Sequence, residues 1–411
     1  MSGGQPEVPV DGLPVAVFGF DIAEAAQIRR IRSLIALGCK VTSFCQRREG
    51  GADFTPEWHN VDLGLVRHKD IRGRALGAVS AVGRAMRGWR QLADAQMVLA
   101  RNLDLALIAL AARRLAALRA GRSAAPLVYE CLDIHDLMTR PDRVGGVMRR
   151  AERHVLSQSA LLVVSSPGFV QNYFAPVQDY IGPTALVENK LWLGLEPGLR
   201  PARPTPAERP ADAPLTIGLV GSIRCQASVE LLMRTADLMG DRLRVRISGA
   251  LHEHSLSGFH EALAARGNVE WTGPYAYPQG LAQAYAGCDL VWAQDMWQRG
   301  TNSDWLLPNR IYEASWCGCP SVGLADTQTG ARIASDGLGW TIARPAPDHL
   351  AALLDRLTPA QLARQRGALL ARPECDFVQD ARDVLPILAP ALSRLAGRGP
   401  LLPGEARQVA G

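Results

Sequence analysis

The chain has 411 residues, of which 47% are hydrophobic and 21% charged, a composition that is typical of two or three globular domains and excludes a mainly disordered protein. The 45 basic and 40 acidic residues leave a net charge of only +5, and because no nucleic-acid-binding motif accompanies this small excess, we expect no nucleic-acid partner. Eight cysteines lie scattered without a CxxC pair or a matching histidine pair, which argues against a zinc site or a disulfide framework.

The N-terminal sequence, MSGGQPEVPVDG, lacks the charged and then apolar order of a signal peptide. The sequence also has no run of about 18 apolar residues, the length needed to cross a bilayer. We therefore expect a cytoplasmic protein that is either free or attached to the inner face of the plasma membrane.

The first half of the chain alternates short apolar runs with helical periodicity. Residues 14–20 predict a strand containing Gly19, residues 21–38 an amphipathic helix and residues 39–44 a second strand. Further strands are expected at residues 95–102, 125–130, 160–166 and 184–190. This alternation predicts a parallel sheet with helices on both faces. The first turn has a single glycine in place of GxGxxG, which argues against a nicotinamide or flavin dinucleotide.

Residues 71–92 combine arginines with an apolar stripe at helical spacing. The pattern predicts an amphipathic helix with Arg84, Arg87 and Arg90 on or beside its polar face. Such a helix can lie on an anionic membrane surface. An ordinary helix that packs against the protein core gives the same pattern, so both interpretations stay open.

The segment CLDIHDLM follows the strand expected at residues 125–130. Residues just beyond the C-terminal end of a strand line the crevice in which open α/β sheets bind ligands. His135 and Asp136 are therefore candidates for a catalytic or sugar-binding role. A helix cap or an exposed surface pair is the alternative interpretation.

A proline-rich segment at residues 199–214 has the composition of a semi-rigid linker and predicts a domain boundary. It separates an N-terminal domain, residues 1–198, from a C-terminal domain, residues 215–375. We expect one long helix within residues 376–397 that returns to the N-terminal domain, and a flexible tail at residues 398–411.

The second half repeats the strand–helix alternation, beginning with a strand at residues 215–224. Gly221 and Ser222 are small enough for backbone N–H groups to approach an anion, and Arg224 adds a fixed positive charge, a combination suited to a diphosphate. Further strands are expected at residues 242–249, 268–273 and 289–294 and in PSVGLA and DGLGWTI.

A helix is expected to carry His252, His254 and His260, but the HExxH spacing of a zinc helix is missing, so we expect no metal.

The stretch WQRGTNSDWLLPNRIYEASWCGCP, residues 297–320, places a polar run before a short helix. Pro308 suits the first helical position and Gly318 suits the helix end. Three consecutive polar residues precede this helix: Asn302, Ser303 and Asp304. On the helix itself, three polar side chains share one surface: Asn309, Arg310 and Glu313. A helix N-terminus of this kind favours an anion, and an ordinary surface helix with an ion pair is the alternative.

Motifs spread over nearly the whole chain resemble those of GT-B glycosyltransferases, in particular the retaining family 4. The matching segments are RRIRSLIALGCKVTSF, YECLDIHDL, LLVVSSPGFVQNYF, LVENK, IGLVGSIR, NVEWTGPYAYPQGLAQAYAGCDLVWA, LPNRIYEASWCGCPSVG and SDGLGWTI. The resemblance implies two Rossmann-like domains facing a cleft, with the acceptor bound by the first and a nucleotide-sugar donor by the second. It implies a hexosyltransferase of polysaccharide biosynthesis that uses a glycan or lipid-linked saccharide acceptor, retains stereochemistry and needs neither a metal nor another cofactor.

The resemblance also implies roles for individual residues. Glu313 matches the acid that binds the nucleotide ribose, and Arg224 at the Gly221 turn matches the contact with the donor diphosphate. His135 with Asp136 matches the first-domain position that faces the transferred sugar. Gly19 matches the turn after the first strand, close to both substrates.

The sequence departs from the family pattern at two positions. A second acid usually stands eight residues before the ribose acid, where this chain has Trp305, and a lysine usually follows the diphosphate arginine, where it has Gln226 and Ser228. We expect Asn302 or Asp304 to contact the sugar instead. Two other functions stay open: a non-catalytic nucleotide- or glycan-binding partner protein, and a sugar-nucleotide epimerase of the same fold.

Overall fold

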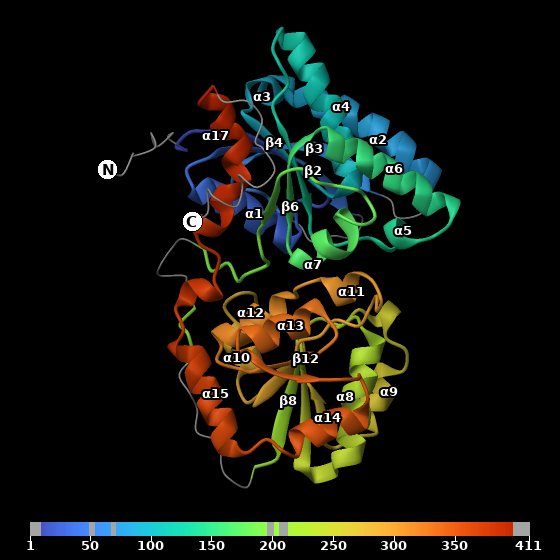
Figure 1. Cartoon of the computed structure of the whole chain (residues 1–411), viewed down its shortest axis with the longest axis vertical. Coiled ribbons are helices and arrows are strands. Elements are labelled where there is room, and N and C mark those ends of the chain that lie inside the picture. The colour runs from blue at the N-terminus through green and yellow to red at the C-terminus, as the bar shows by residue number, and fades with distance from the viewer. Residues whose placement is uncertain (1–9, 49–53, 67–70, 195–200, 205–212, 398–411) are drawn as a thin grey trace. The chain divides into compact units, whose positions relative to one another are not determined.

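The structure is a computed structural model that describes residues 10–48, 54–66, 71–194, 201–204 and 213–397, without the side chains of residues 66 and 71–76. The chain forms two compact units (Figure 1). Unit 1 contains the residues up to Glu188 and those from Asp380 onward, and unit 2 contains Asn189–Gln379. Each unit is a parallel α/β domain, as the strand–helix alternation predicts.

Unit 1 is built on a seven-stranded sheet of order β3-β2-β1-β4-β5-β6-β7, in which neighbouring strands are parallel. Its strands are β1 (Pro14–Gly19), β2 (Lys40–Arg48), β3 (His59–Val66), β4 (Met97–Arg101), β5 (Leu127–Cys131), β6 (Ser159–Val164) and β7 (Thr184–Leu186). The strand β3 was not predicted. It lies at the sheet edge, where polar residues such as Asn60 and Asp62 interrupt the apolar run that marks a buried strand.

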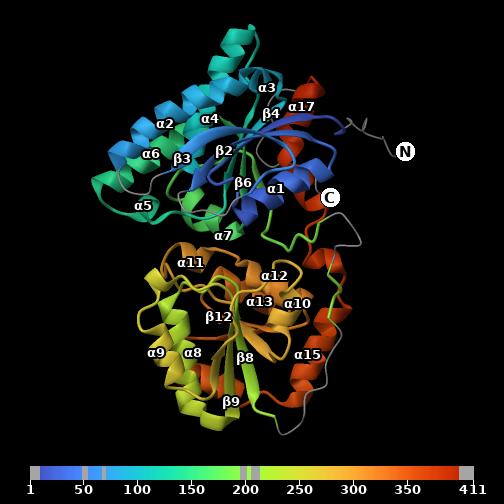
Figure 2. The same ribbon diagram turned by 180° about the vertical axis from the view of Figure 1, so that it is seen from behind.

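Helices cover both faces of this sheet. They are α1 (Ala25–Ala36), α2 (Ile71–Ala85), α3 (Trp89–Asp94), α4 (Asn102–Ala120), α5 (Asp136–Thr139), α6 (Arg143–Ser157), α7 (Pro167–Phe169), α16 (Ala381–Val384) and α17 (Ala389–Leu395). The helices α2, α4 and α6 lie side by side on one face, and α1 and α17 lie together on the other (Figures 1 and 2). Within the described residues, no helix combines the length with the apolar character that a bilayer crossing requires.

The C-terminal segment is not the single long helix that its sequence predicts. It consists of α16, a 3-10 turn at Leu385–Leu388 and α17. Pro386 and Pro390 lack a backbone N–H and therefore interrupt helical hydrogen bonding. Buried side chains of the segment, such as Leu388, share a hydrophobic core with Val15 of β1, so this segment belongs to unit 1.

Unit 2 is built on a six-stranded sheet of order β10-β9-β8-β11-β12-β13, again with parallel neighbours. Its strands are β8 (Leu215–Val220), β9 (Leu243–Ser248), β10 (Val269–Trp271), β11 (Leu290–Trp292), β12 (Ser321–Leu324) and β13 (Gly339–Ile342). The helices are α8 (Gln226–Met239), α9 (Phe259–Ala264), α10 (Leu281–Tyr285), α11 (Asn302–Trp305), α12 (Asn309–Trp316), α13 (Gln328–Ser335), α14 (Pro347–Leu354) and α15 (Pro359–Ala371). Along β11, Leu290 and Trp292 pack with α8 and α14, whereas Val291 packs with α10 and α12.

The three histidines predicted on one helix are divided among different elements. His252 precedes a 3-10 turn at Glu253–Ser255, which contains His254, and His260 lies on α9. Gly258 has a φ of +63° between the two elements. This left-handed residue interrupts the helix that the sequence predicts.

The division between the units falls between Glu188 and Asn189, before the proline-rich segment. Leu191 is buried in the core of unit 2, where its N–H donates to the carbonyl of Phe377 at 2.9 Å. Arg203, inside the predicted linker, also attaches to unit 2 through the carbonyls of Trp316, Leu369, Leu370 and Arg372. These contacts join residues far apart in the sequence, so the local composition could not predict them. The predicted tail at residues 398–411 lies outside the described residues.

Candidate donor site in unit 2

The C-terminal ends of β8 and β9 form a tight turn region in unit 2. Gly221 has a φ of +109°, which favours glycine, and its N–H donates to the carbonyl of Ser248 at 2.9 Å. A Cβ atom on Gly249 would lie 1.7 Å from the carbonyl oxygen of Gly221. Both glycines are therefore required for the ends of these strands to approach each other.

Arg310 reaches this turn from the first turn of α12. Its Nε donates to the carbonyl of Val220 at 2.5 Å, and its Nη2 donates to the carbonyl of Ser222 at 3.2 Å. These bonds hold a guanidinium charge next to Gly221. The structure thus brings together two predicted donor-binding segments that lie far apart in the sequence.

Arg224 adds a second guanidinium at the same edge, with half of its side chain exposed. Its Nη2 lies 3.7 Å from Oδ2 of Asp295, which follows β11 and is mostly buried. The Oδ1 of Asp295 accepts from the N–H of Trp297 at 3.0 Å and from the hydroxyl of Ser303. Asp295 was not among the predicted residues, although it directly follows the strand expected at residues 289–294, where ligand-binding side chains are common.

The polar run before α12 lies in the short helix α11 and is held by bonds to the segment just before it. Ser303 is fully buried, and its hydroxyl accepts from the N–H of Gln298 at 2.7 Å. Asp304 accepts from the N–H of Gly300 at 2.8 Å and pairs with Arg299 at 3.1 Å. These contacts shape the loop, and Asn302 is likewise buried.

The helix α12 confirms the predicted capping signals within one residue. It begins at Asn309, with Pro308 as the preceding cap. At its end Gly318 has a φ of +70°, and Cys319 and Gly318 donate to the carbonyls of Ala314 and Ser315 at 2.8 and 3.0 Å. This is a Schellman motif, in which glycine at the left-handed position satisfies the last carbonyl groups.

Glu313 lies on α12 with only 6% of its surface exposed. Its Oε2 accepts from the hydroxyl of Tyr285 at 3.4 Å. Burial raises the pKa of Tyr285, and the negative charge of Glu313 raises it further. The same two causes raise the pKa of Tyr275. Both phenols therefore stay protonated near Glu313 and are available as hydrogen-bond donors.

The remaining predicted residues lie in unit 1. Gly19 ends β1, and a Cβ there would lie 2.3 Å from Cδ of Gln27, so a larger residue would have to displace the Gln27 side chain. His135 and Asp136 follow β5 and have side chains 62% and 61% exposed. The Nδ1 of His135 accepts from the N–H of Leu137 at 3.2 Å, which makes this residue the cap of α5. The strand β4 separates β1 from β5 in the sheet.

A buried ionic cluster lies at the C-terminal ends of β4 and β5 and was not predicted. The Nε atoms of Arg30 and Arg101 lie 2.7 and 2.8 Å from the two carboxylate oxygens of Glu130, and the three side chains are at most 5% exposed. Arg101 also donates to Oε1 of Gln27 at 3.0 Å. Burial alone would raise the pKa of Glu130, but the two arginines outweigh burial and hold this pKa below its usual value.

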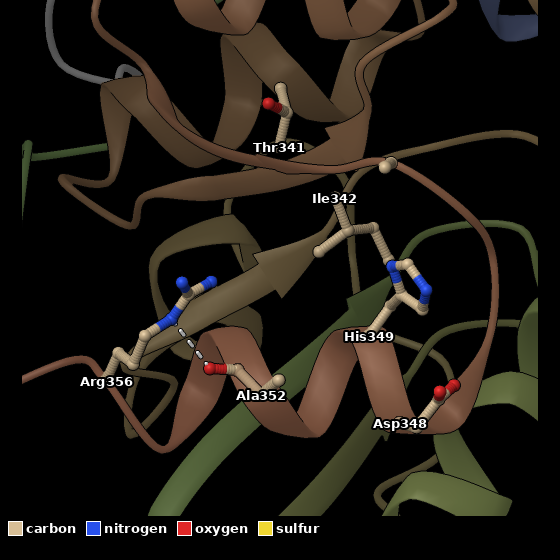
Figure 3. Close-up of a pocket in the computed structure, with 7 residues that line it drawn as sticks. Thr341, Ile342, Asp348, His349, Ala352 and Arg356 are labelled. Atoms are coloured by element: carbon tan, nitrogen blue, oxygen red, sulfur yellow. Dashed lines mark hydrogen bonds between the residues drawn. The ribbon is translucent and has the colours of Figure 1, made fainter.

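A hollow of about 360 Å³ lies elsewhere in unit 2, between the end of β13 and α14 (Figure 3). Its lining residues are Thr341, Ile342, Ala343, Asp348, His349, Ala352 and Arg356. The guanidinium of Arg356, just beyond α14, donates to the carbonyl of Ala352 in that helix at 2.9 Å (Figure 3). The predicted donor-binding residues are not in this lining, so the hollow is separate from the edge at β8 and β9.

Comparison with known proteins places the chain in a family, although no protein-family model matches it. The chain is 32% identical over 353 residues to the succinoglycan biosynthesis protein ExoL of Rhizobium meliloti, a match that covers 84% of this chain and 85% of that protein. Among solved structures it is similar to sucrose-phosphate synthase of Thermosynechococcus elongatus, with a TM-score of 0.65, 12% identity and coverage of 94% and 98%.

Two further glycosyltransferase-fold structures align over most of the chain. HepE of Anabaena, solved with UDP and glucose, gives a TM-score of 0.58 at 14% identity. The alignment covers 93% of this chain and 99% of HepE. WaaG, a glycosyltransferase of lipopolysaccharide biosynthesis, gives 0.57 at 15% identity with coverage of 88% and 97%. The predicted GT-B fold is confirmed. The chain belongs to the family of the succinoglycan biosynthesis protein ExoL, and its fold is the GT-B fold of glycosyltransferases.

Proposed function

We propose that this protein is a glycosyltransferase of polysaccharide biosynthesis that moves a hexose from a nucleotide sugar to a glycan or a lipid-linked saccharide. The observation that carries the proposal is the arrangement on α12, where Arg310 is fixed at the Gly221 turn and Glu313 lies one helical turn further on. A diphosphate suits the two arginines at this edge, and a carboxylate suits the ribose hydroxyls. HepE, which has the same fold, was solved with UDP-glucose, which supports a nucleotide-sugar donor here.

The charges at this edge suit the departure of a nucleoside diphosphate. As the bond between the sugar and the diphosphate breaks, Arg224 and Arg310 stabilise the charge that grows on the leaving oxygen. The acceptor hydroxyl attacks the sugar carbon from the side on which the diphosphate departs, and it passes its proton to that diphosphate. Attack from this side retains the stereochemistry of the sugar. In this proposal the arginines take the electrostatic role that a metal ion has in other enzymes. Four residues stay predictions for contact with the sugar: His135, Asp136, Asn302 and Asp304.

A ligand screen followed by product analysis tests the proposed function. UDP, ADP and GDP are added separately, and the nucleotide that binds the folded protein should raise its melting temperature by mass action. The matching nucleotide sugars are then incubated with lipid-linked saccharides, and mass spectrometry should show one added hexose. Binding without turnover of any donor would favour a non-catalytic binding protein. An epimerised nucleotide sugar formed without acceptor would favour an epimerase.

We also propose that unit 1 contacts an anionic membrane through the region of α2 and α3, which would bring it near a lipid-linked acceptor. Val79 is 73% exposed, and Arg87 and Arg90 are exposed. Arg84 is a poorer candidate because its Nη1 donates to the carbonyl of Leu63 at 3.0 Å. An exposed apolar side chain beside arginines suits the headgroup region of an anionic bilayer.

Replacing Arg87 and Arg90 together by glutamate should lower flotation with phosphatidylglycerol vesicles by more than about tenfold, because each arginine near the surface contributes about 1 kcal/mol. UDP affinity should not change. The matched control replaces Arg234 and Arg344, which are exposed in unit 2, by glutamate. Equal loss of flotation in both double variants would assign binding to net charge and would exclude the α2–α3 region as the contact.

A further inference from the structure

The position of the missing lysine is occupied by residues that are already in use within unit 2. Gln226 Nε2 donates to Glu230 at 2.8 Å. Ser228 is buried, and its hydroxyl accepts from Nε1 of Trp292 at 3.2 Å. Neither side chain carries a charge, so neither can replace the lysine that the family resemblance implies near Arg224.

His252 reaches the same edge from the end of β9. The segments after β8 and β9 stay paired beyond the strands, through a bridge between Ile223 and Leu251 and a bond of 3.0 Å from the N–H of His252 to the carbonyl of Ile223. The Nε2 of His252 lies 2.7 Å from the hydroxyl oxygen of Ser222. Ser222 is exposed and His252 is partly exposed, so an anion at the turn can reach the hydroxyl.

A proton on Nε2 of His252 decides what the hydroxyl of Ser222 can offer. An imidazole that carries this proton, as the imidazolium always does, donates from Nε2 to the hydroxyl oxygen and leaves the hydroxyl hydrogen free to donate to a phosphate oxygen. An imidazole whose Nε2 lacks a proton instead accepts from the hydroxyl and turns its hydrogen away from the ligand. The carbonyl of the same Ser222 is already held by Arg310, which fixes the backbone from which the hydroxyl projects.

We propose that protonated His252 acts through Ser222 as a further cationic group for the donor diphosphate, beside Arg224 and Arg310 and in place of the missing lysine. The inference rests on the proposed function, because it assumes that this edge binds a nucleoside diphosphate. It makes His252 a positioning residue and Ser222 the group that touches the phosphate. Binding then takes up a proton, so the contribution of His252 falls as the pH rises through the titration range of the imidazole.

Other charged and titratable groups on neighbouring elements act on this proton. They are Glu253 and His254 on the adjoining turn, His260 on α9, Arg224 after β8, Glu230 on α8, Asp295 after β11 and Arg310 on α12. A bound diphosphate favours the imidazolium, because its negative charge stabilises the positive ring. The pH dependence of UDP affinity is therefore the property to measure.

Calorimetric titration of the full chain with UDP and with uridine tests this inference at about pH 6 and about pH 8, on either side of the ordinary histidine range. His252→Gln should weaken UDP binding about tenfold at the lower pH, as expected for one charge-assisted hydrogen bond. It should have little effect at the higher pH and none on uridine. His252→Lys, which keeps a positive charge at both values, should retain tight UDP binding throughout.

The matched control is His260→Gln, which removes an exposed histidine that pairs with Glu253 at 3.6 Å. It should leave UDP affinity unchanged. If the natural protein binds UDP tightly and His252→Gln binds it equally well, this inference fails while the donor assignment stands. The inference also fails if His260→Gln weakens UDP binding as much as His252→Gln does. If the natural protein binds no UDP at either pH, the donor assignment fails and the inference fails with it.

Discussion

Replacing Glu313 by alanine should weaken UDP binding by about ten- to hundredfold, because the loss of a carboxylate that accepts from ribose hydroxyls removes about 1.5–3 kcal/mol. The carboxylate is suited to this role because α12 holds it almost fully buried, with Tyr285 as a fixed donor on one oxygen. A preformed acceptor of this kind loses little conformational entropy when the nucleotide binds. Calorimetric titration with UDP measures the change.

The ribose assignment is tested separately with 2′,3′-dideoxy-UDP. If Glu313 binds the ribose, removing the hydroxyls and removing the carboxylate should cost the same interaction, so the two losses should not add in a double-mutant cycle. The control is Glu270→Gln, an exposed acid on β10 that should leave UDP affinity unchanged. Fully additive losses would mean that Glu313 stabilises the site without touching the ribose.

Replacing Glu130 by glutamine should lower the stability of unit 1 by about 3–5 kcal/mol, the effect expected when one partner of a buried ion pair is removed. The reason is that Arg30 and Arg101 would keep their charges with no anion beside them. Because the folded-state pKa of Glu130 lies below its unfolded value, its contribution is present above the unfolded pKa and is lost as the pH falls through the folded pKa. Urea unfolding of the full chain near neutral pH and in acid measures both effects.

An exposed acid in the same unit provides the control for this prediction. Glu57 pairs with Arg32 at 2.6 Å, but both side chains are well exposed, so Glu57→Gln should change stability by less than about 1 kcal/mol. Equal destabilisation by Glu57→Gln and Glu130→Gln would show that the buried cluster has no special role. A Glu130→Gln variant as stable as the natural protein would show the same.

Several properties of this protein could be predicted from local sequence. The alternation of apolar strands and amphipathic helices predicts two parallel sheets, because the periodicity of side chains reflects which face of each element is buried. The limits of α12 were predictable from Pro308 and Gly318, since capping depends on residues within one turn. Glu313, Arg224 and Gly221 could be selected because each belongs to a short motif.

Local sequence was less informative where distant contacts decide the structure. Nothing near Leu191 indicates that it packs in unit 2, because its partner Phe377 lies near the other end of that unit. The segment after Asp380 has helical periodicity, but Pro386 and Pro390 divide it into short pieces. The edge strand β3 was missed because polar residues such as Asn60 and Asp62 interrupt its apolar run.

The sequence by itself determined the fold class, because the spacing of apolar residues shows which elements form and which faces are buried. It also predicted the candidate donor residues, from short motifs and their resemblance to a known family. Only the tertiary structure decided which side chains meet: it brought His252 to Ser222, Asp295 to Arg224 and Arg310 to the Gly221 turn. The physical reason is that neighbouring parallel strands end at the same edge of a sheet however far apart they lie in the sequence. The shared edge of β8, β9 and β11 therefore assembles residues that no local pattern connects.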